Sequence, residues 1–237
     1  MKLFRCLPIE EPTLALSHVL RATLLTFEFI ETHGPIELTP ELAFHSQFVA
    51  WASEAFDWPH FSARTSHGVV RLLDDEEFLP LVVVHDLLIA TSFIQRDQGL
   101  LRMTPRALEL RSKPNELWFF LVNNLLFLTD HNKYAQGDGA FTGDWAKYMI
   151  VLNNMPEAGL SDTRLCAMIY GGGEARFRND DHEYVQALYV HVLQPLAWAG
   201  LLTEERNGHG ADRVCSFTRT PLWAAALQVG AHPPLAH

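Results

Sequence analysis

One pattern occurs twice in this 237-residue chain and limits the folds that the chain can adopt. A long apolar segment is followed by a strand-like run, a turn with glycine, a second strand-like run and a Thr-Pro step. The first copy ends with Leu101-Arg102-Met103-Thr104-Pro105 and the second with Phe217-Thr218-Arg219-Thr220-Pro221. Threonine can cap a helix and proline fits its first turn, so each step predicts the start of a short helix. An internal repeat of this kind predicts two copies of one supersecondary unit.

The first half of the chain has the pattern of helices with one hairpin. Apolar residues at helical spacing predict helices over 12–31, from Thr39-Pro40 to about Phe56, and over 78–92. Ile36-Glu37-Leu38 is strand-like and leads into Thr39-Pro40, a third copy of the strand-to-Thr-Pro step. The runs 93–96 and 100–103 flank a glycine turn and predict a hairpin, followed by a short helix through Leu110.

After a break near Lys113-Pro114, the second half repeats the end of this order. We expect helices over 116–129, 144–153, 161–170 and 181–199, with a glycine-containing loop over 130–143. The strands 201–206 and 213–217 flank Asn207-Gly208-His209-Gly210, and a final short helix begins after Thr220. The predicted fold is therefore mainly α with short β-hairpins, in two units over 1–113 and 114–237.

This order of elements resembles the winged helix-turn-helix superfamily. The step Ala199-Gly200-Leu201-Leu202 before the second hairpin resembles the Gly-Leu-Leu or Gly-Leu-Ile step that commonly enters the wing in that family. The phrase from Gly34 to Pro40 also resembles the opening of uncharacterised bacterial proteins that accompany mobile genetic elements. The first resemblance implies tandem winged-helix-like units and, most often, transcriptional regulation with the helix before the wing in the major groove.

The two helices that would read DNA have the wrong side chains for that task. Base edges are read by Arg, Lys, Asn, Gln or Ser. Between Leu79 and Ala90 only His85 and Asp86 interrupt the apolar residues. Between Tyr184 and Ala199 the chain has Gln186, His191 and Gln194 but no cation. A helix that is apolar on all sides is buried, so both are predicted to lie in the core or at a subunit interface.

Charge places the best candidate for nucleic-acid contact on the first hairpin. The chain carries 18 basic and 28 acidic residues, a net charge of −10 that disfavours non-specific binding to nucleic acid or anionic membranes. The segment 94–113 is locally basic, and its candidate phosphate-contacting residues are Arg96, Arg102, Arg106, Arg111 and Lys113. The alternative interpretation is a solvated hairpin and helix end.

The sequence contains no motif that predicts catalysis. The histidines do not form HExxH, and the cysteines Cys6, Cys166 and Cys215 have no CxxC spacing, so neither a metal site nor a disulfide framework is indicated. His85, Asp86 and His191 are expected in a core contact, an interface or a pocket. His182 among acidic residues is better explained by a helix N-terminus than by a metal. No catalytic residue, metal or cofactor is predicted.

Two segments bear on the location of the protein. Glu10 and Glu11 interrupt the N-terminal apolar residues, which argues against a signal peptide. Residues 184–203 carry no charge, but their glutamines, Pro195 and Gly200 favour a buried helix and the start of a strand over a membrane span. We expect a cytoplasmic protein without membrane contact.

These observations predict a non-catalytic regulatory or adaptor protein of winged-helix type, which acts through protein contacts and forms a homodimer through its apolar helices. The first alternative is a DNA-binding transcriptional regulator that uses the first wing. The second is a metal-dependent or small-molecule-binding enzyme around His85 or His182.

Overall fold

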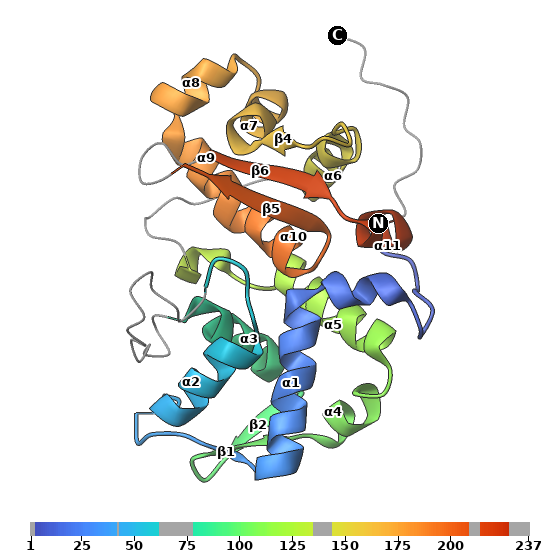
Figure 1. The fold of residues 1–237 in the computed structure, drawn as a ribbon, viewed down its shortest axis with the longest axis vertical. Coiled ribbons are helices and arrows are strands. Elements are labelled where there is room, and N and C mark those ends of the chain that lie inside the picture. The colour runs from blue at the N-terminus through green and yellow to red at the C-terminus, as the bar shows by residue number, and fades with distance from the viewer. Residues whose placement is uncertain (1–2, 42, 62–77, 135–143, 209–213, 228–237) are drawn as a thin grey trace. The chain divides into compact units, whose positions relative to one another are not determined.

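The computed structural model describes residues 3–41, 43–61, 78–134, 144–208 and 214–227 (Figure 1). The chain divides into two compact units, an N-terminal unit of Pro8–Thr129 and a C-terminal unit of Asp130–His237 together with Met1–Leu7. Each unit is mostly helical and contains one three-stranded antiparallel sheet. The predicted class, mainly α with short hairpins, is therefore confirmed.

The N-terminal unit begins with helices and ends with helices around its small sheet. Its elements are η1 (Pro12–Leu16), α1 (His18–His33), β1 (Ile36–Glu37), α2 (Ser46–Ala55), α3 (Leu79–Ala90), β2 (Ile94–Asp97), β3 (Leu100–Met103), α4 (Pro105–Leu110) and α5 (Pro114–Phe127).

The C-terminal unit has the same kinds of element in the same order, with additional helices. They are η2 (His131–Tyr134), α6 (Trp145–Asn153), β4 (Leu160–Ser161), α7 (Asp162–Tyr170), α8 (Glu174–Asn179), α9 (His182–Leu188), η3 (Tyr189–Leu193), α10 (Gln194–Trp198), β5 (Leu202–Asn207), β6 (Val214–Arg219) and α11 (Pro221–Ala226). The N-terminal segment joins this unit because Phe4 pairs with Leu227 and the Arg5 N–H donates to the Ala226 carbonyl at 2.7 Å.

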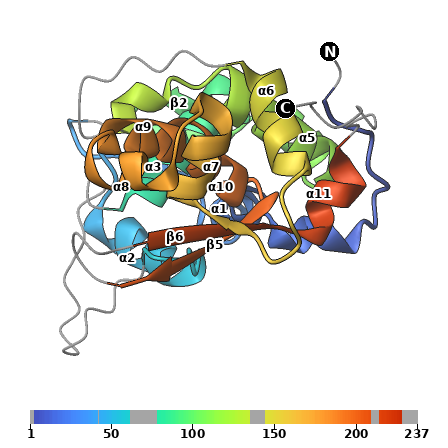
Figure 2. The same cartoon turned by 90° about the horizontal axis from the view of Figure 1, so that it is seen from above.

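The two sheets have the same topology and register. Their strand orders are β1-β3-β2 and β4-β6-β5, and β5 and β6 lie side by side in both views (Figures 1 and 2). Ile94 faces Met103 at the base of the first hairpin, as Leu202 faces Arg219 in the second. The first hairpin is shorter, with strands of 4 residues against 6. The internal repeat predicted from the sequence is thus present as a structural repeat.

The turn from helix to hairpin is built the same way in both units. Ser92 and Gly200 have positive φ angles of 57° and 82°, which close the preceding helix. The next N–H then bonds back by five residues: Phe93 donates to the Leu88 carbonyl at 2.8 Å, and Leu201 donates to that of Leu196 at 2.9 Å. Glycine adopts this backbone at little cost, whereas Ser92 adopts a conformation that side chains rarely favour.

A threonine connects each hairpin to the helix that follows it, α4 in the N-terminal unit and α11 in the C-terminal unit. The Thr104 and Thr220 hydroxyls accept bonds from the N–H groups of Ala107 and Trp223 at 3.3 and 3.4 Å, as N-caps do. Each hydroxyl also donates to the residue that closes the earlier helix, Thr104 to the Ser92 carbonyl at 2.8 Å and Thr220 to the Gly200 carbonyl at 2.6 Å. Two of the three predicted Thr-Pro helix starts are therefore confirmed.

The third Thr-Pro step was wrongly assigned to a helix. The Thr39 N–H bonds to the Ala43 carbonyl at 2.8 Å and its hydroxyl accepts from the Ala43 N–H at 3.2 Å, so Thr39 pairs with Ala43 and does not cap a helix. The helix α2 begins only at Ser46. The predicted helix over 12–31 is also divided, because Ser17 is extended and its hydroxyl caps α1 by accepting from the Leu20 N–H at 3.3 Å.

The long helix predicted over 181–199 contains a π-helical segment. At the end of η3, the Gln194 N–H bonds to the Tyr189 carbonyl, five residues back. Pro195 follows directly, and proline lacks an N–H and collides with the carbonyl of the preceding turn in a regular α-helix. The wider π turn accommodates Pro195, so α9, η3 and α10 follow one another without a break. Within the described residues no helix is long and apolar enough to cross a membrane.

The division of the chain differs from the predicted boundary at 113/114. The helix α5 belongs to the N-terminal unit, since it contacts α1, α3, α4 and η1. Its side chains Leu117, Trp118, Leu121 and Leu125 are fully buried. Lys113-Pro114 separates two helices of one core, which local sequence cannot distinguish from a boundary between domains.

His18 at the start of α1 makes the stability of the fold depend on pH. Burial, and next the positive charge of Arg21, lower the pKa of His18 from 6.5 to about 4. The unfolded chain therefore takes up a proton below pH 6.5 that the native state resists until about pH 4, so stability is lost as the pH falls through this window. Relative to a His18→Gln variant, we expect the natural chain to lose about 2 kcal/mol more between pH 7 and 5 in urea denaturation. His182→Gln, at an exposed helix start, is the matched control. Equal dependence of the unfolding free energy on pH in the natural chain and in His18→Gln would contradict the role given to His18.

Candidate functional site

The cations of the first hairpin and the following helices all have partners inside the N-terminal unit. The side-chain contacts pair Arg96 with His85, Arg102 with Asp97, Arg106 with the Thr91 carbonyl, Arg111 with Glu31, and Lys113 with Glu109. The Arg102–Asp97 and Lys113–Glu109 pairs join partly exposed groups at 3.3 and 3.1 Å, so each stabilises little. A phosphate would have to compete with these partners.

Arg106 holds the end of α3. Its guanidinium donates to the Thr91 carbonyl at 3.2 Å and lies over the rings of Phe93 and Phe120, 5.2 and 4.6 Å from their centroids. Cation–π contacts on two rings occupy the planar faces of the guanidinium. Arg106 therefore joins the segment between α3 and β2 to α5, which is a structural role.

Arg96, a candidate for phosphate contact, meets His85 and Asp86, the candidates for a core contact, interface or pocket. The Arg96 guanidinium lies 3.1 Å from His85 Nε2, and His85 Nδ1 lies 3.2 Å from an Asp86 carboxylate oxygen. Arginine has only donors, so Nε2 accepts and Nδ1 carries the proton that is donated to Asp86. The ring of Phe44 meets that of His85 edge-on at 5.4 Å. The imidazole lone pair is thus used inside the unit.

The C-terminal unit has a corresponding link between its long helix and its hairpin. Glu204, the third residue of β5 as Arg96 is of β2, accepts from Arg206 Nε at 2.6 Å and from the Tyr189 hydroxyl at 3.2 Å. Arg206 Nη2 and Gln194 Nε2 donate to the same hydroxyl at 2.7 and 3.2 Å. Burial, and then the charge of Glu204, raise the pKa of Tyr189. The network joins η3 to β5, the first strand of the second hairpin.

His191 lies in the π-helical segment and faces a different group of residues from His85. Its ring is 6.2 Å from that of the buried His131, at an interplanar angle of 87°. Burial lowers the pKa of His191, and the carboxylate of Asp130 opposes this shift. His191 belongs to the C-terminal unit and His85 and Asp86 to the N-terminal unit.

The N-terminal unit contains a pocket that sequence reasoning missed. It has a volume of about 620 Å³ and is formed by the end of α1, the strand β1 and the start of α2. Its rings include Phe29, Phe48 and Trp51, and its polar rim includes His33, Glu37 and His45. The spacing of Phe29 and His33, one helical turn apart at the end of α1, was the available signal. Only the tertiary structure brings His45 to the same pocket.

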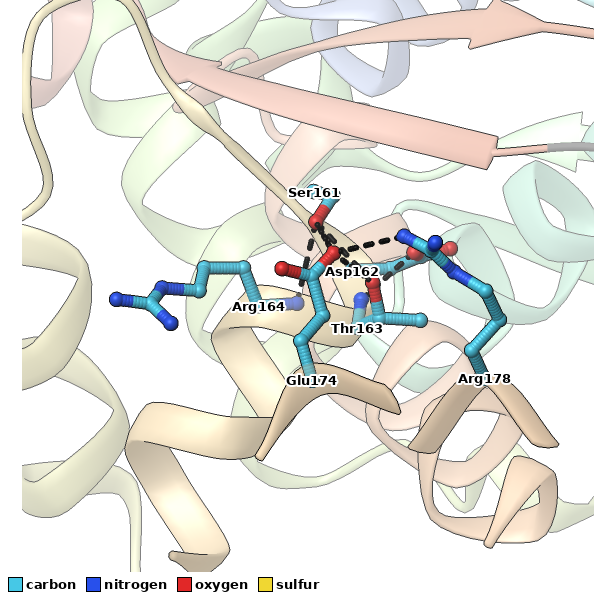
Figure 3. A network of polar contacts seen from close by, with 6 residues as sticks. All are labelled: Ser161, Asp162, Thr163, Arg164, Glu174 and Arg178. Carbon is cyan, nitrogen blue, oxygen red and sulfur yellow. Dashed lines mark hydrogen bonds and ion pairs between the residues drawn. The ribbon is translucent and has the colours of Figure 1, made fainter. Parts of the chain in front are cut away.

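The start of α7 carries a polar network in the C-terminal unit (Figure 3). The Ser161 hydroxyl caps α7 by accepting from the Arg164 N–H at 3.1 Å. The Glu174 carboxylate accepts from the hydroxyls of Ser161 and Thr163 at 3.2 and 2.9 Å and from Arg178 at 3.0 Å. The hydroxyl of Thr163 is the largest cause that lowers the pKa of Glu174. A carboxylate from α8 thus sits at the N-terminus of α7.

The described side chains form no candidate metal cluster, and the thiol of Cys166 is buried. In the part of the chain that the structure describes, no three His, Cys, Asp or Glu side chains are placed to hold a metal ion. Burial, followed by the charge of Asp162, raises the pKa of Cys166 to about 12, which makes this thiol a poor nucleophile.

Comparison with known proteins gives matches over both units. Residues 15–116 match the model of the Y4jL N-terminal domain, and residues 135–221 match that of the y4jL C-terminal domain. The chain is 28% identical over 159 residues to "Uncharacterized protein y4jL" of Sinorhizobium fredii (strain NBRC 101917 / NGR234), which covers 66% of this chain and 71% of that protein. No solved structure matches. The two family models thus match one in each unit, in the order N-terminal domain and then C-terminal domain.

Proposed function

We propose that each unit is a winged helix without a DNA-reading face, and that the protein is a non-catalytic regulatory or adaptor protein that acts through protein contacts. The order of helices and the strand orders β1-β3-β2 and β4-β6-β5 support the winged-helix assignment. In this assignment α3 and the run from α9 to α10 stand where a DNA-binding family places its recognition helix.

The observation that carries the proposal is the burial of most of α3 and of all of α10. Val83, Val84, Leu87 and Leu88 of α3 are at most 1% exposed. Every residue of α10 is buried, whereas α9 buries only Val185 and Leu188. A side chain that packs in the core cannot contact a base edge. The exposed large apolar side chains of these helices are Ile89 on α3 and Tyr184 on α9, at 36% and 41%.

The exposed face of α5 offers the surface for a second copy of the chain. Phe119 and Phe127 are 38% and 36% exposed, and Leu128, just after the helix, is 75% exposed. Residues four apart lie on one helical face, with Asn123 between the two phenylalanines. In an antiparallel pair centred on Asn123, Phe119 would face Phe127 of the partner subunit, as a two-fold axis requires. A protein partner with an apolar groove is the alternative occupant.

This proposal predicts self-association that depends on α5. We expect the full chain to sediment as a dimer at tens of micromolar, and Phe119→Glu to raise the dissociation constant by about 30-fold or more, since a central aromatic contributes about 2 kcal/mol. Met168→Glu is the matched control, because Met168 is also exposed (42%) but lies on α7. Analytical ultracentrifugation makes the measurement.

Two results would count against the proposal. A strict monomer would exclude the dimer. An electrophoretic shift of duplex DNA that survives moderate salt and is lost in Arg96→Ala/Arg102→Ala would favour the alternative of a DNA-binding regulator that uses the first wing.

A further inference from the structure

The outer face of α1 carries two leucines between two opposite charges. Arg21, Leu24, Leu25 and Glu28 are spaced at i, i+3, i+4 and i+7, so they form one stripe along the helix, which we call the α1 stripe. The opposite face of α1 packs in the core, where Phe27 is 2% exposed, whereas Leu24 and Leu25 are only half-buried. The helix lies at the front of the N-terminal unit in Figure 1.

The α1 stripe lines a groove on the surface of the N-terminal unit. The groove has a volume of about 350 Å³, and its other lining residues are Leu14, Ala15, Leu20 and Pro114, from η1, α1 and the start of α5. The lining is aliphatic except for Arg21 and Glu28. A concave aliphatic surface with half-buried leucines gains stability when a second apolar surface covers it, because more apolar area then leaves water.

Both charges of the α1 stripe have capacity for a further ion pair. Among the described residues, the Glu28 carboxylate makes no hydrogen bond or ion pair. Arg21 donates through Nη2 to the carbonyls of Phe56 and Asp57. Its Nη1 lies 3.9 Å from the carboxylate of Asp57, which is 91% exposed, so this pair is weak. The guanidinium has five N–H donors, and those of Nη1 are therefore available to a second carboxylate.

The α1 stripe is complementary to itself about a two-fold axis. When two α1 helices pack antiparallel with the axis between Leu24 and Leu25, Arg21 and Glu28 are equally far from the axis. Arg21 then faces Glu28 of the partner subunit, and Leu24 packs against Leu25 of the partner subunit. The two-fold axis produces each of these pairs twice. A parallel packing would instead place like charges opposite each other.

We propose that the α1 stripe is a contact surface for a second copy of the chain, with the two α1 helices antiparallel across a two-fold axis. This surface is separate from the exposed face of α5 around Asn123, and it does not depend on the contact proposed there. A chain with two different self-contacts links its dimers into larger assemblies. The ion pairs of the α1 contact are exposed, so salt weakens the association.

The test uses the full chain with Phe119→Glu, which removes the α5 contact and leaves the α1 contact. Because its ion pairs are exposed, we expect weak, reversible dimers, with a dissociation constant of about 0.1–1 mM in sedimentation velocity at low salt. Adding Glu28→Arg places two arginines opposite each other on both sides of the axis and is expected to weaken the dimer at least about 10-fold. Glu54→Arg, the same change of charge at an exposed position of α2, is the matched control.

A mixture of two charge variants tests the predicted pairing directly. Arg21→Glu has an acid at both positions and Glu28→Arg has a base at both, so each variant repels itself, whereas mixed copies pair Arg with Glu twice. We expect the mixture to associate at least about 10-fold more tightly than either variant alone. Each substitution changes the net charge of −10 by only two, so both variants remain negative and a general attraction between them is not expected.

Three results would overturn the proposal. They are a Phe119→Glu chain that stays monomeric up to about 1 mM, equal association of the Glu28→Arg and Glu54→Arg variants, and a mixture of folded charge variants that associates no more tightly than either alone. The first two do not require Arg21→Glu, which also loses the bonds of Arg21 to the end of α2. If Phe119→Glu associates as strongly as the natural chain, the α5 contact is wrong, and Glu28→Arg still decides the α1 contact.

Discussion

Arg206→Met is expected to lower the free energy of unfolding of the C-terminal unit by about 3–5 kcal/mol, as measured by urea denaturation. The Glu204 side chain is 7% exposed and that of Arg206 is 20% exposed, and they are joined at 2.6 Å. Without Arg206 the carboxylate stays buried beside a neutral hydroxyl, and its lost solvation is not compensated. The large effect comes from the unpaired charge and not from the net strength of the pair.

The double variant Glu204→Gln/Arg206→Met separates these two causes. Because the amide is neutral, we expect it to recover most of the stability lost in Arg206→Met. Arg178→Met is the matched control, since Arg178 is 61% exposed and its 3.0 Å pair with Glu174 contributes at most about 1 kcal/mol. Equal losses for Arg206→Met and Arg178→Met would refute the claim that the Glu204 charge is desolvated.

Gly159→Ala is expected to destabilise the C-terminal unit by about 3 kcal/mol or more in the same measurement. Gly159 precedes β4 with a φ angle of 79°, and an added Cβ would lie 2.4 Å from the Phe217 carbonyl oxygen and 2.5 Å from Thr218 Cγ2. The carbonyl belongs to β6, with which β4 pairs at Leu160 and Phe217. The strand would have to move away from its partner, so the cost includes lost pairing as well as backbone strain.

Gly34→Ala in the N-terminal unit provides the matched control. Gly34 also precedes the first strand of its unit and has a φ angle of 92°, but no atom lies within 4 Å of the added Cβ. Only the backbone cost remains, about 1–2 kcal/mol. If the two alanine variants lose equal stability, the close approach of Gly159 to β6 is not important.

The structural repeat also explains how two similar units can differ in what they do. In each unit, a side chain of the helix before the hairpin contacts the third residue of the first hairpin strand. The pair is His85 and Arg96 in the N-terminal unit and Tyr189 and Glu204 in the C-terminal unit. Their second helices differ more: α7 is capped by Ser161, whereas α2 begins beside a pocket.

Local signals in the sequence predicted the elements that short-range physics controls. Thr104-Pro105 and Thr220-Pro221 start helices because the hydroxyl reaches an amide three residues away. The same signal failed at Thr39-Pro40, where the threonine hydroxyl bonds to Ala43. The helix α8 over Glu174–Asn179 was not predicted because it has only 6 residues and follows three glycines. Capping is a local preference that neighbouring contacts can override.

The sequence by itself determined the class of fold, the repeated unit and the apolar character of α3, since helix periodicity, hairpin turns and caps depend on residues close along the chain. Only the tertiary structure decided what the polar side chains do. Arg96 meets His85 across 11 positions and Trp223 meets Asn153 across 70. The pocket around Phe29 and His45 likewise arises where three elements converge. Charges and rings have no fixed partners in an extended chain, and folding selects them by bringing distant residues into contact.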